Sequence, residues 1–204
     1  EKMDDYLELF AADEDEIVGD PIGETALLQQ LGYAMIPYSP DGLVAIAERE
    51  FAWCETEKNK VIAELGARDW SDALRMAKEA HVAPGEQPAM IKELHDESVS
   101  FLRERDLLTI PDFADEVWRM QMMSPARQKV SPYFTGGEVI SISYPTDGMA
   151  HEEKMKSMLG NNRHFSRATV HHELIPGHHL QSYMAQRWNT DRSMCYTPFY
   201  VEGW

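Results

Sequence analysis

The chain has 204 residues, a length that suits one domain or one and a half. Its composition, 43% hydrophobic and 26% charged, is ordinary for a globular protein with a sizeable core. The formal charge of −16 disfavours nucleic acids and anionic membrane surfaces as partners, because an acidic surface repels them. No stretch approaches the ~18 consecutive apolar residues that a membrane-spanning helix needs.

The two cysteines, Cys54 and Cys195, can form one disulfide or none, so they do not identify a redox compartment. Secreted, periplasmic and cytoplasmic locations all stay open, as does the oligomeric state. The sequence begins at Glu1 without an initiator methionine and stops abruptly at Trp204. These ends are typical of a piece of a longer protein.

Residues 1–110 are predicted to form a helical N-terminal region. Apolar residues recur at helical spacing, and prolines and glycines mark the ends of these stretches. The expected helices cover residues 2–12, 24–36, 41–66, 69–81 and 86–108.

Residues 111–204 form the region that carries the histidine motif. Three prolines interrupt its start, where one short helix is expected around 113–123. The alternating run "GGEVISISYP" predicts a small β element at about 138–144. Helices are expected over 150–160 and from about 164 through the histidines. The fold class is therefore mainly α, with both regions belonging to one continuous domain that is truncated at its C-terminus.

The segment "HHELIPGHHLQ" (171–181) holds four of the eight histidines. In zinc hydrolases of the helix type, two histidines four residues apart lie on one face, and the glutamate after the first is the general base. His172 and Glu173 fit the first half of that pattern. His178 stands six residues after His172, and an unbroken helix would place it nearly opposite.

The Pro176–Gly177 pair resolves this mismatch. Proline cannot donate a backbone hydrogen bond, and its ring clashes with the carbonyl four residues earlier, which belongs to His172. Glycine adopts backbone conformations closed to other residues. We therefore expect two looped-out residues, a bulge that returns His178 to the face of His172. His179 is the weaker candidate for second ligand, since it lies about two turns from His172.

The third ligand is expected from a later helix. Glu202, in "YVEGW", stands 24 residues beyond His178, enough for the motif helix to end and the chain to turn back. The remaining histidines have no other candidate ligands near them in the sequence and are interpreted as structural or exposed. They are His81, His95, His151 and His164. The serines of "ISISYP" have no base beside them in the sequence, which disfavours a serine nucleophile.

At these residues the chain resembles the bacterial domain of unknown function 885 family, whose members share His-Glu-x-x-Pro-Gly-His-His-x-Gln and a later Glu-Gly-Trp. That family is similar to the glutamate-type zinc peptidases, including the helical oligopeptidases related to thimet oligopeptidase and carboxypeptidase Taq. The resemblance implies a multi-helix zincin-like fold, zinc on His172, His178 and Glu202, and Glu173 as catalytic base. Many family members look like secreted proteins or lipoproteins.

We therefore expect a zinc metallopeptidase that hydrolyses short peptides with a zinc-activated water. Further candidates to support the ligands or the oxyanion are His179, Gln181, Tyr144 and Tyr200. The β element is expected to line the cleft and pair with an extended substrate. Two alternatives stay open: hydrolysis of non-peptide amides or esters, and a non-catalytic helical binding protein whose zinc is lost or structural. A structural site would need a fourth ligand, Cys195 or His179.

Overall fold

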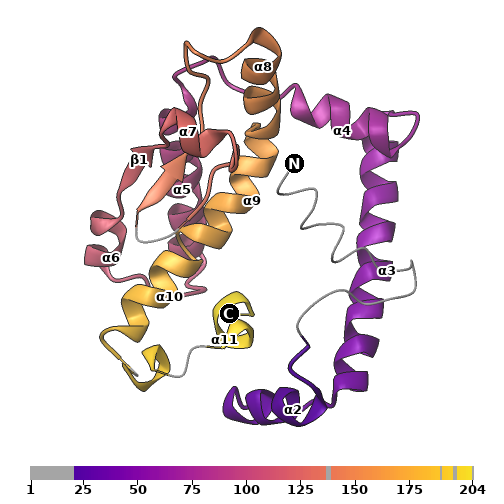
Figure 1. Cartoon of the computed structure of the whole chain (residues 1–204), viewed down its shortest axis with the longest axis vertical. Helices are drawn as coiled ribbons and strands as arrows, with labels where there is room; N and C mark the ends of the chain where they lie inside the picture. Colours follow the sequence, from indigo (N-terminus) through magenta and orange to yellow (C-terminus); the bar gives the residue numbers. More distant parts are fainter. Residues whose placement is uncertain (1–20, 137–138, 189, 195–196, 204) are drawn as a thin grey trace, which may run out of the picture. The chain divides into compact units, whose positions relative to one another are not determined.

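A computed structural model describes residues 21–136, 139–188, 190–194 and 197–203. The expected helix at 2–12 lies outside these residues. The described chain is mainly helical, with one small parallel sheet (Figure 1). Its elements are α2 (Glu24–Tyr33), α3 (Pro40–Leu65), α4 (Trp70–Lys78), α5 (Gln87–Glu104), α6 (Asp112–Val117), β1 (Met120–Met122), α7 (Pro125–Gln128), β2 (Ile140–Ile142), α8 (His151–Gly160), α9 (Arg163–Glu173), α10 (His178–Ala185), η1 (Thr190–Ser193) and α11 (Pro198–Glu202).

The chain divides into two compact units, residues 1–45 and 46–204. The first holds α2 and the beginning of α3, and the second holds every residue of the histidine motif. The expected division into regions 1–110 and 111–204 stays a prediction.

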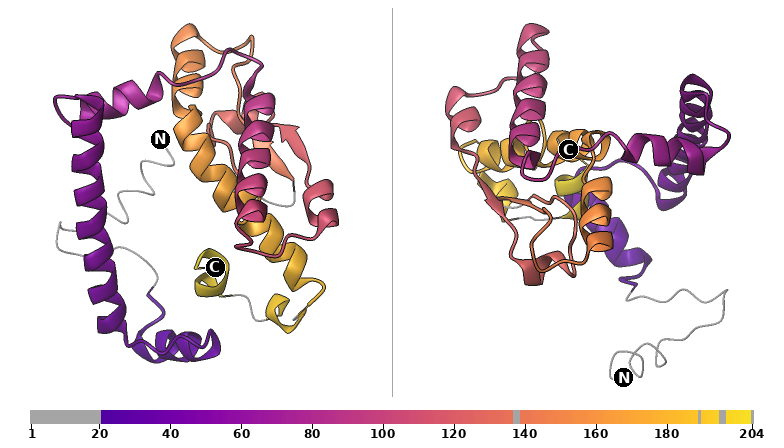
Figure 2. Two further views of the ribbon diagram at one scale, coloured as in Figure 1. Left: turned by 180° about the vertical axis from the view of Figure 1, so that it is seen from behind. Right: turned by 90° about the horizontal axis from the view of Figure 1, so that it is seen from above.

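Helices α5 and α9 form the framework of the second unit and lie side by side (Figure 1, and Figure 2, left). Leu94 of α5 and Val170 of α9 are fully buried in one hydrophobic cluster. Two exposed ion pairs reinforce the contact, Arg163 with Glu93 and Arg167 with Glu97. Arg163 binds its partner through both nitrogens, at 2.5 and 3.2 Å. The apolar contact contributes most of the stability, because exposed ion pairs are worth ~1 kcal/mol or less.

The sheet covers this framework next to the histidine motif. Strand β1 pairs in parallel with β2, Gln121 lying opposite Ser141. Ile140 and Ile142 of β2 are buried in the same cluster as Leu94. The expected β element is thus present, but the short helix predicted around 113–123 is wrong in its second half. Helix α6 ends at Val117, and Met120–Met122 form β1.

Among the described residues, none of the helices combines the length and apolar character needed to cross a membrane.

Candidate metal centre

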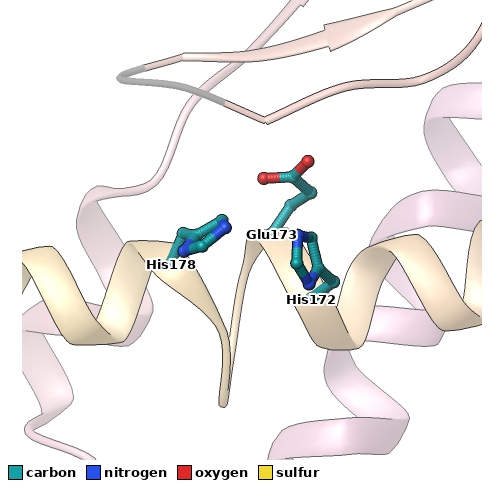
Figure 3. A group of neighbouring side chains, drawn as sticks. All are labelled: His172, Glu173 and His178. Atoms are coloured by element: carbon teal, nitrogen blue, oxygen red, sulfur yellow. The ribbon is translucent and has the colours of Figure 1, made fainter. Parts of the chain in front are cut away.

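The helix that begins at Arg163 is interrupted within the motif. Helix α9 ends at Glu173, the next four residues leave the helix, and α10 starts at His178 (Figure 3). The expected two-residue bulge inside one helix is therefore wrong in form. Its predicted consequence is observed, because the ring centroids of His172 and His178 lie 4.5 Å apart with an interplanar angle of 74°.

Gly177 permits this turn by its small size. A Cβ built on it would lie 1.8 Å from the backbone oxygen of His172 and 2.5 Å from that of His171. Its φ is −71°, so the turn does not depend on the left-handed conformation that glycine adopts readily. The constraint is close approach of two backbone segments, which only glycine allows here.

The two residues before Pro176 fix the turn to the interior. Leu174 and Ile175 are both completely buried, but they belong to different hydrophobic clusters. The hydroxyl of Ser98 on α5 donates to the carbonyl of Ile175 at 2.7 Å. The Leu180 N–H donates to the carbonyl of Leu174 at 3.3 Å, across the break. The position of His178 relative to His172 is thus set by buried contacts.

The short helix α11 brings Glu202 to these two histidines. Thr197 caps the helix by accepting from the N–H of Tyr200 at 3.3 Å. Oε2 of Glu202 lies 3.5 Å from Nε2 of His172 and 3.5 Å from Nε2 of His178. Tetrahedral zinc with bonds of ~2.0–2.1 Å holds its ligand atoms roughly 3.3 Å apart. The distance from the carboxylate oxygen of Glu202 to each imidazole nitrogen is close to this value.

Gln181 prepares His178 for such a role. Its side-chain amide donates to the carbonyl of Tyr200 at 2.8 Å, so its oxygen faces His178. That oxygen accepts from Nδ1 of His178 at 3.2 Å. With the proton held on Nδ1, Nε2 of His178 carries the lone pair that a metal needs. Gln181 therefore orients one proposed ligand and ties down the helix that carries another.

Glu173 also lies beside the histidine pair. Its carboxylate points toward the segment that leads into β2 (Figure 3), where a Cβ on Gly136 would lie 1.7 Å from Oε2. One ligand atom from each of His172, Glu173 and His178 lies within 4.8 Å of the others. Glu173 and Glu202 thus both place a carboxylate near the two imidazole rings.

A cavity of about 300 Å³ opens on the Glu202 side of the pair. It is lined by Leu108, His171, His172, Pro176, Gly177, His178, Val201 and Glu202. Burial lowers the pKa of His171, and the charge of Arg167 adds to this effect. A neutral imidazole is thus the favoured state of His171 at the rim. The cavity leaves room for a small ligand or an extended segment beside the three candidate ligands.

The other candidates have different surroundings. His179 is turned toward α6, where its Nε2–H donates to the carbonyl of Ala114 at 2.7 Å. Tyr200 contributes its backbone carbonyl to Gln181, and the N–H of Tyr144 donates to Gln128 at 2.9 Å beyond β2. Neither tyrosine lines the cavity. Cys195 lies outside the described residues.

The expected pairing of substrate with β2 is wrong, because both edges of this strand are occupied. On one side, Ile140 N–H donates to Arg119 and Met123 N–H donates to Ile142. On the other, Thr135 and Ser141 exchange two hydrogen bonds of 3.0 and 2.9 Å.

Sequence reasoning missed Gly136 and Ser98. The glycine pair at the head of "GGEVISISYP" was a signal for the first, since glycine beside a strand often marks a close approach. Ser98 sits on α5 with no motif around it, and only the fold shows that it holds the turn.

The fold and the site together describe a helical protein with a His–Glu–His–Glu cluster at a helix break. The chain belongs to the family of bacterial proteins of unknown function DUF885, whose family model matches residues 1–204. Comparisons with curated proteins and with solved structures found no match.

Proposed function

We propose that this protein is a zinc-dependent hydrolase, and that its substrates are short peptides. The observation that carries the proposal is the position of Glu202, whose Oε2 is 3.5 Å from Nε2 of both histidines. The order of the residues, His-Glu, then His, then a later Glu, is similar to that of the glutamate-type zinc peptidases. His172, His178 and Glu202 would hold the metal.

Zinc in such a site supplies Lewis-acid chemistry, which polarises a carbonyl and lowers the pKa of a water toward ~7. The residues of the chain supply the remaining functions. Glu173, whose carboxylate lies within 4.8 Å of a nitrogen of each imidazole, accepts a proton from the attacking water and delivers it to the leaving amine. Gln181 keeps His178 in one tautomer. The cavity beside Glu202 accommodates part of the substrate.

A peptide-library cleavage assay on the zinc-loaded protein tests this function. The matched variant is Glu173→Gln, which keeps the size and polarity of the side chain but cannot accept a proton at neutral pH. We expect the variant to keep its zinc and to lose at least about a hundredfold in kcat, the range that a positioned base supplies. Cleavage by Glu173→Gln at the wild-type rate would remove Glu173 from the mechanism. Hydrolysis of small esters or amides but of no peptide would change the substrate class.

A further inference from the structure

Gly136 and Glu173 share one volume of space. A Cβ on Gly136 would lie 1.7 Å from Oε2 of Glu173, 2.3 Å from Cδ and 3.0 Å from Oε1. All three atoms belong to the carboxyl group, and no real Cβ tolerates contacts under 3.0 Å. The half-buried carboxylate of Glu173 therefore occupies the place that any other residue at position 136 would fill with its side chain.

The segment before Gly136 is fixed and cannot retreat from the carboxylate. Phe134 is buried, and its N–H donates to Oδ1 of Asn161 at 2.8 Å. Thr135 exchanges two backbone hydrogen bonds with Ser141 of β2. Ser141 is itself buried. These contacts anchor the main chain directly before Gly136, so an added methyl group would have to displace the neighbouring side chain.

The contrast with Gly177 shows what kind of constraint this is. At Gly177 the obstructing atoms are backbone, so a side chain there must distort the fold. At Gly136 they are the end of a flexible side chain, which can rotate away at small cost in stability. A small residue at position 136 would thus leave the fold in place and move the carboxylate alone.

We propose that Gly136 is a positioning residue for Glu173: its missing side chain is the space in which the carboxylate is held beside His172 and His178. This inference rests on the proposed function, in which Glu173 is the base. A general base must lie within hydrogen-bond reach of the proton it takes, and a misplacement of about 1 Å costs on the order of a hundredfold in rate.

The test combines a crystal structure of metal-free Gly136→Ala with the kinetics of its zinc-loaded form. The carboxylate of Glu173 moves away from residue 136, while His172, His178 and Glu202 keep their places. Zinc content stays that of the wild type, kcat falls ten- to a hundredfold, and KM changes by less than about twofold, since only transition-state stabilisation is lost. Gly148→Ala is the matched control, because its added methyl meets nothing within 4 Å. It keeps wild-type kcat.

A double substitution separates positioning from general damage. Glu173→Asp shortens the side chain by one methylene and removes most of the overlap, so adding Gly136→Ala to it lowers kcat by less than about threefold. This smaller loss is the non-additive result expected of two residues in contact. If Gly136→Ala folds poorly, adding Glu173→Ala to it removes the obstructing carboxylate and restores the yield of folded protein. An unmoved carboxylate in the Gly136→Ala crystal structure overturns the proposal, as does an equal kcat loss in both backgrounds. If the wild-type protein binds no zinc or cleaves no substrate, the proposed function is contradicted instead. The crystal structure of Gly136→Ala still shows whether residue 136 determines the position of the Glu173 carboxylate.

Discussion

The side-chain amide of Gln181 joins the two helices that carry the proposed ligands. It is buried, accepts from His178 on its own helix α10, and donates to the carbonyl of Tyr200 on α11. Through these two bonds Gln181 links the ring of His178 to the helix that carries Glu202.

Replacing Gln181 by alanine should weaken zinc binding about 10–100-fold, the usual cost of losing a group that orients a ligand. The His178 ring would lose its tautomer preference, and α11 would lose its attachment to α10. Competition with a chromogenic chelator measures the affinity. Gln181→Glu keeps the acceptor for His178 and loses only the donor, so it should give a smaller loss. Wild-type affinity in Gln181→Ala would contradict the role given to this residue.

Gly177→Ala should destabilise the protein by about 1–3 kcal/mol or more, because the new Cβ meets the backbone of His172 and the core cannot yield without strain. Gly177→Val should cost more, and Pro176→Ala should be milder. Urea unfolding compares the variants, with Gly148→Ala as control. Zinc content should fall together with stability, since the turn sets the position of His178. Equal stability of Gly177→Ala and wild type would mean that the turn has another conformation.

At the scale of elements, α5 supports α6 through a buried histidine. His95 is 1% exposed, its ring lies 4.8 Å from that of Trp118, and Nδ1 is 3.3 Å from Asp96. Nε2 is 3.5 Å from Asp115 of α6, which also pairs with Arg103. Burial lowers the pKa of His95 below its ordinary value of 6.5, against the opposing effect of Asp96 and Asp115.

This shift predicts acid sensitivity. Between the folded and unfolded pKa values the unfolded chain binds more protons, so the contribution of His95 is complete above about pH 6.5 and is lost as the pH falls through its lowered folded pKa. Thermal unfolding at about pH 7.5 and about pH 5 should show a drop in Tm that is smaller in His95→Gln than in wild type. The acidic groups paired with Arg163 and Arg167 titrate in both proteins, so their effect on Tm cancels when the two drops are compared. An equal drop in Tm in the two proteins would exclude His95 as a source of the acid sensitivity.

Most helices of the described chain were predictable, because glycine and proline mark their ends and local spacing marks their faces. Helix α8 differs from expectation by one residue at its start, and helix α3 by one residue at each end. Strand β1 was not predictable, since its pairing with β2 depends on a contact 20 residues away in sequence. The helix break was predicted from Pro176, but its form depends on where Leu174 and Ile175 are buried. The nearness of Glu173 to Gly136 likewise follows from the sheet, which spacing along the chain does not reveal.

At the scale of the molecule, the histidine turn lies where two hydrophobic clusters meet. Leu174 belongs to the cluster with Leu94 and Ile140, and Ile175 to the cluster with Val99 and Leu180. Both sides of the fold therefore hold the same four-residue turn. The net charge of −16 adds self-repulsion, which a bound divalent cation would reduce locally.

The zinc content of the purified protein, measured by mass spectrometry beside three ligand variants, tests the central claim most directly. We expect about one zinc per chain in the wild type, and close to none in His172→Ala, His178→Ala and Glu202→Ala. His179→Ala is the matched control: its ring faces Ala114, so it should retain the metal with at most modest weakening. Loss of zinc in His179→Ala together with full zinc in His178→Ala would contradict the account, as would a wild-type protein that binds no zinc.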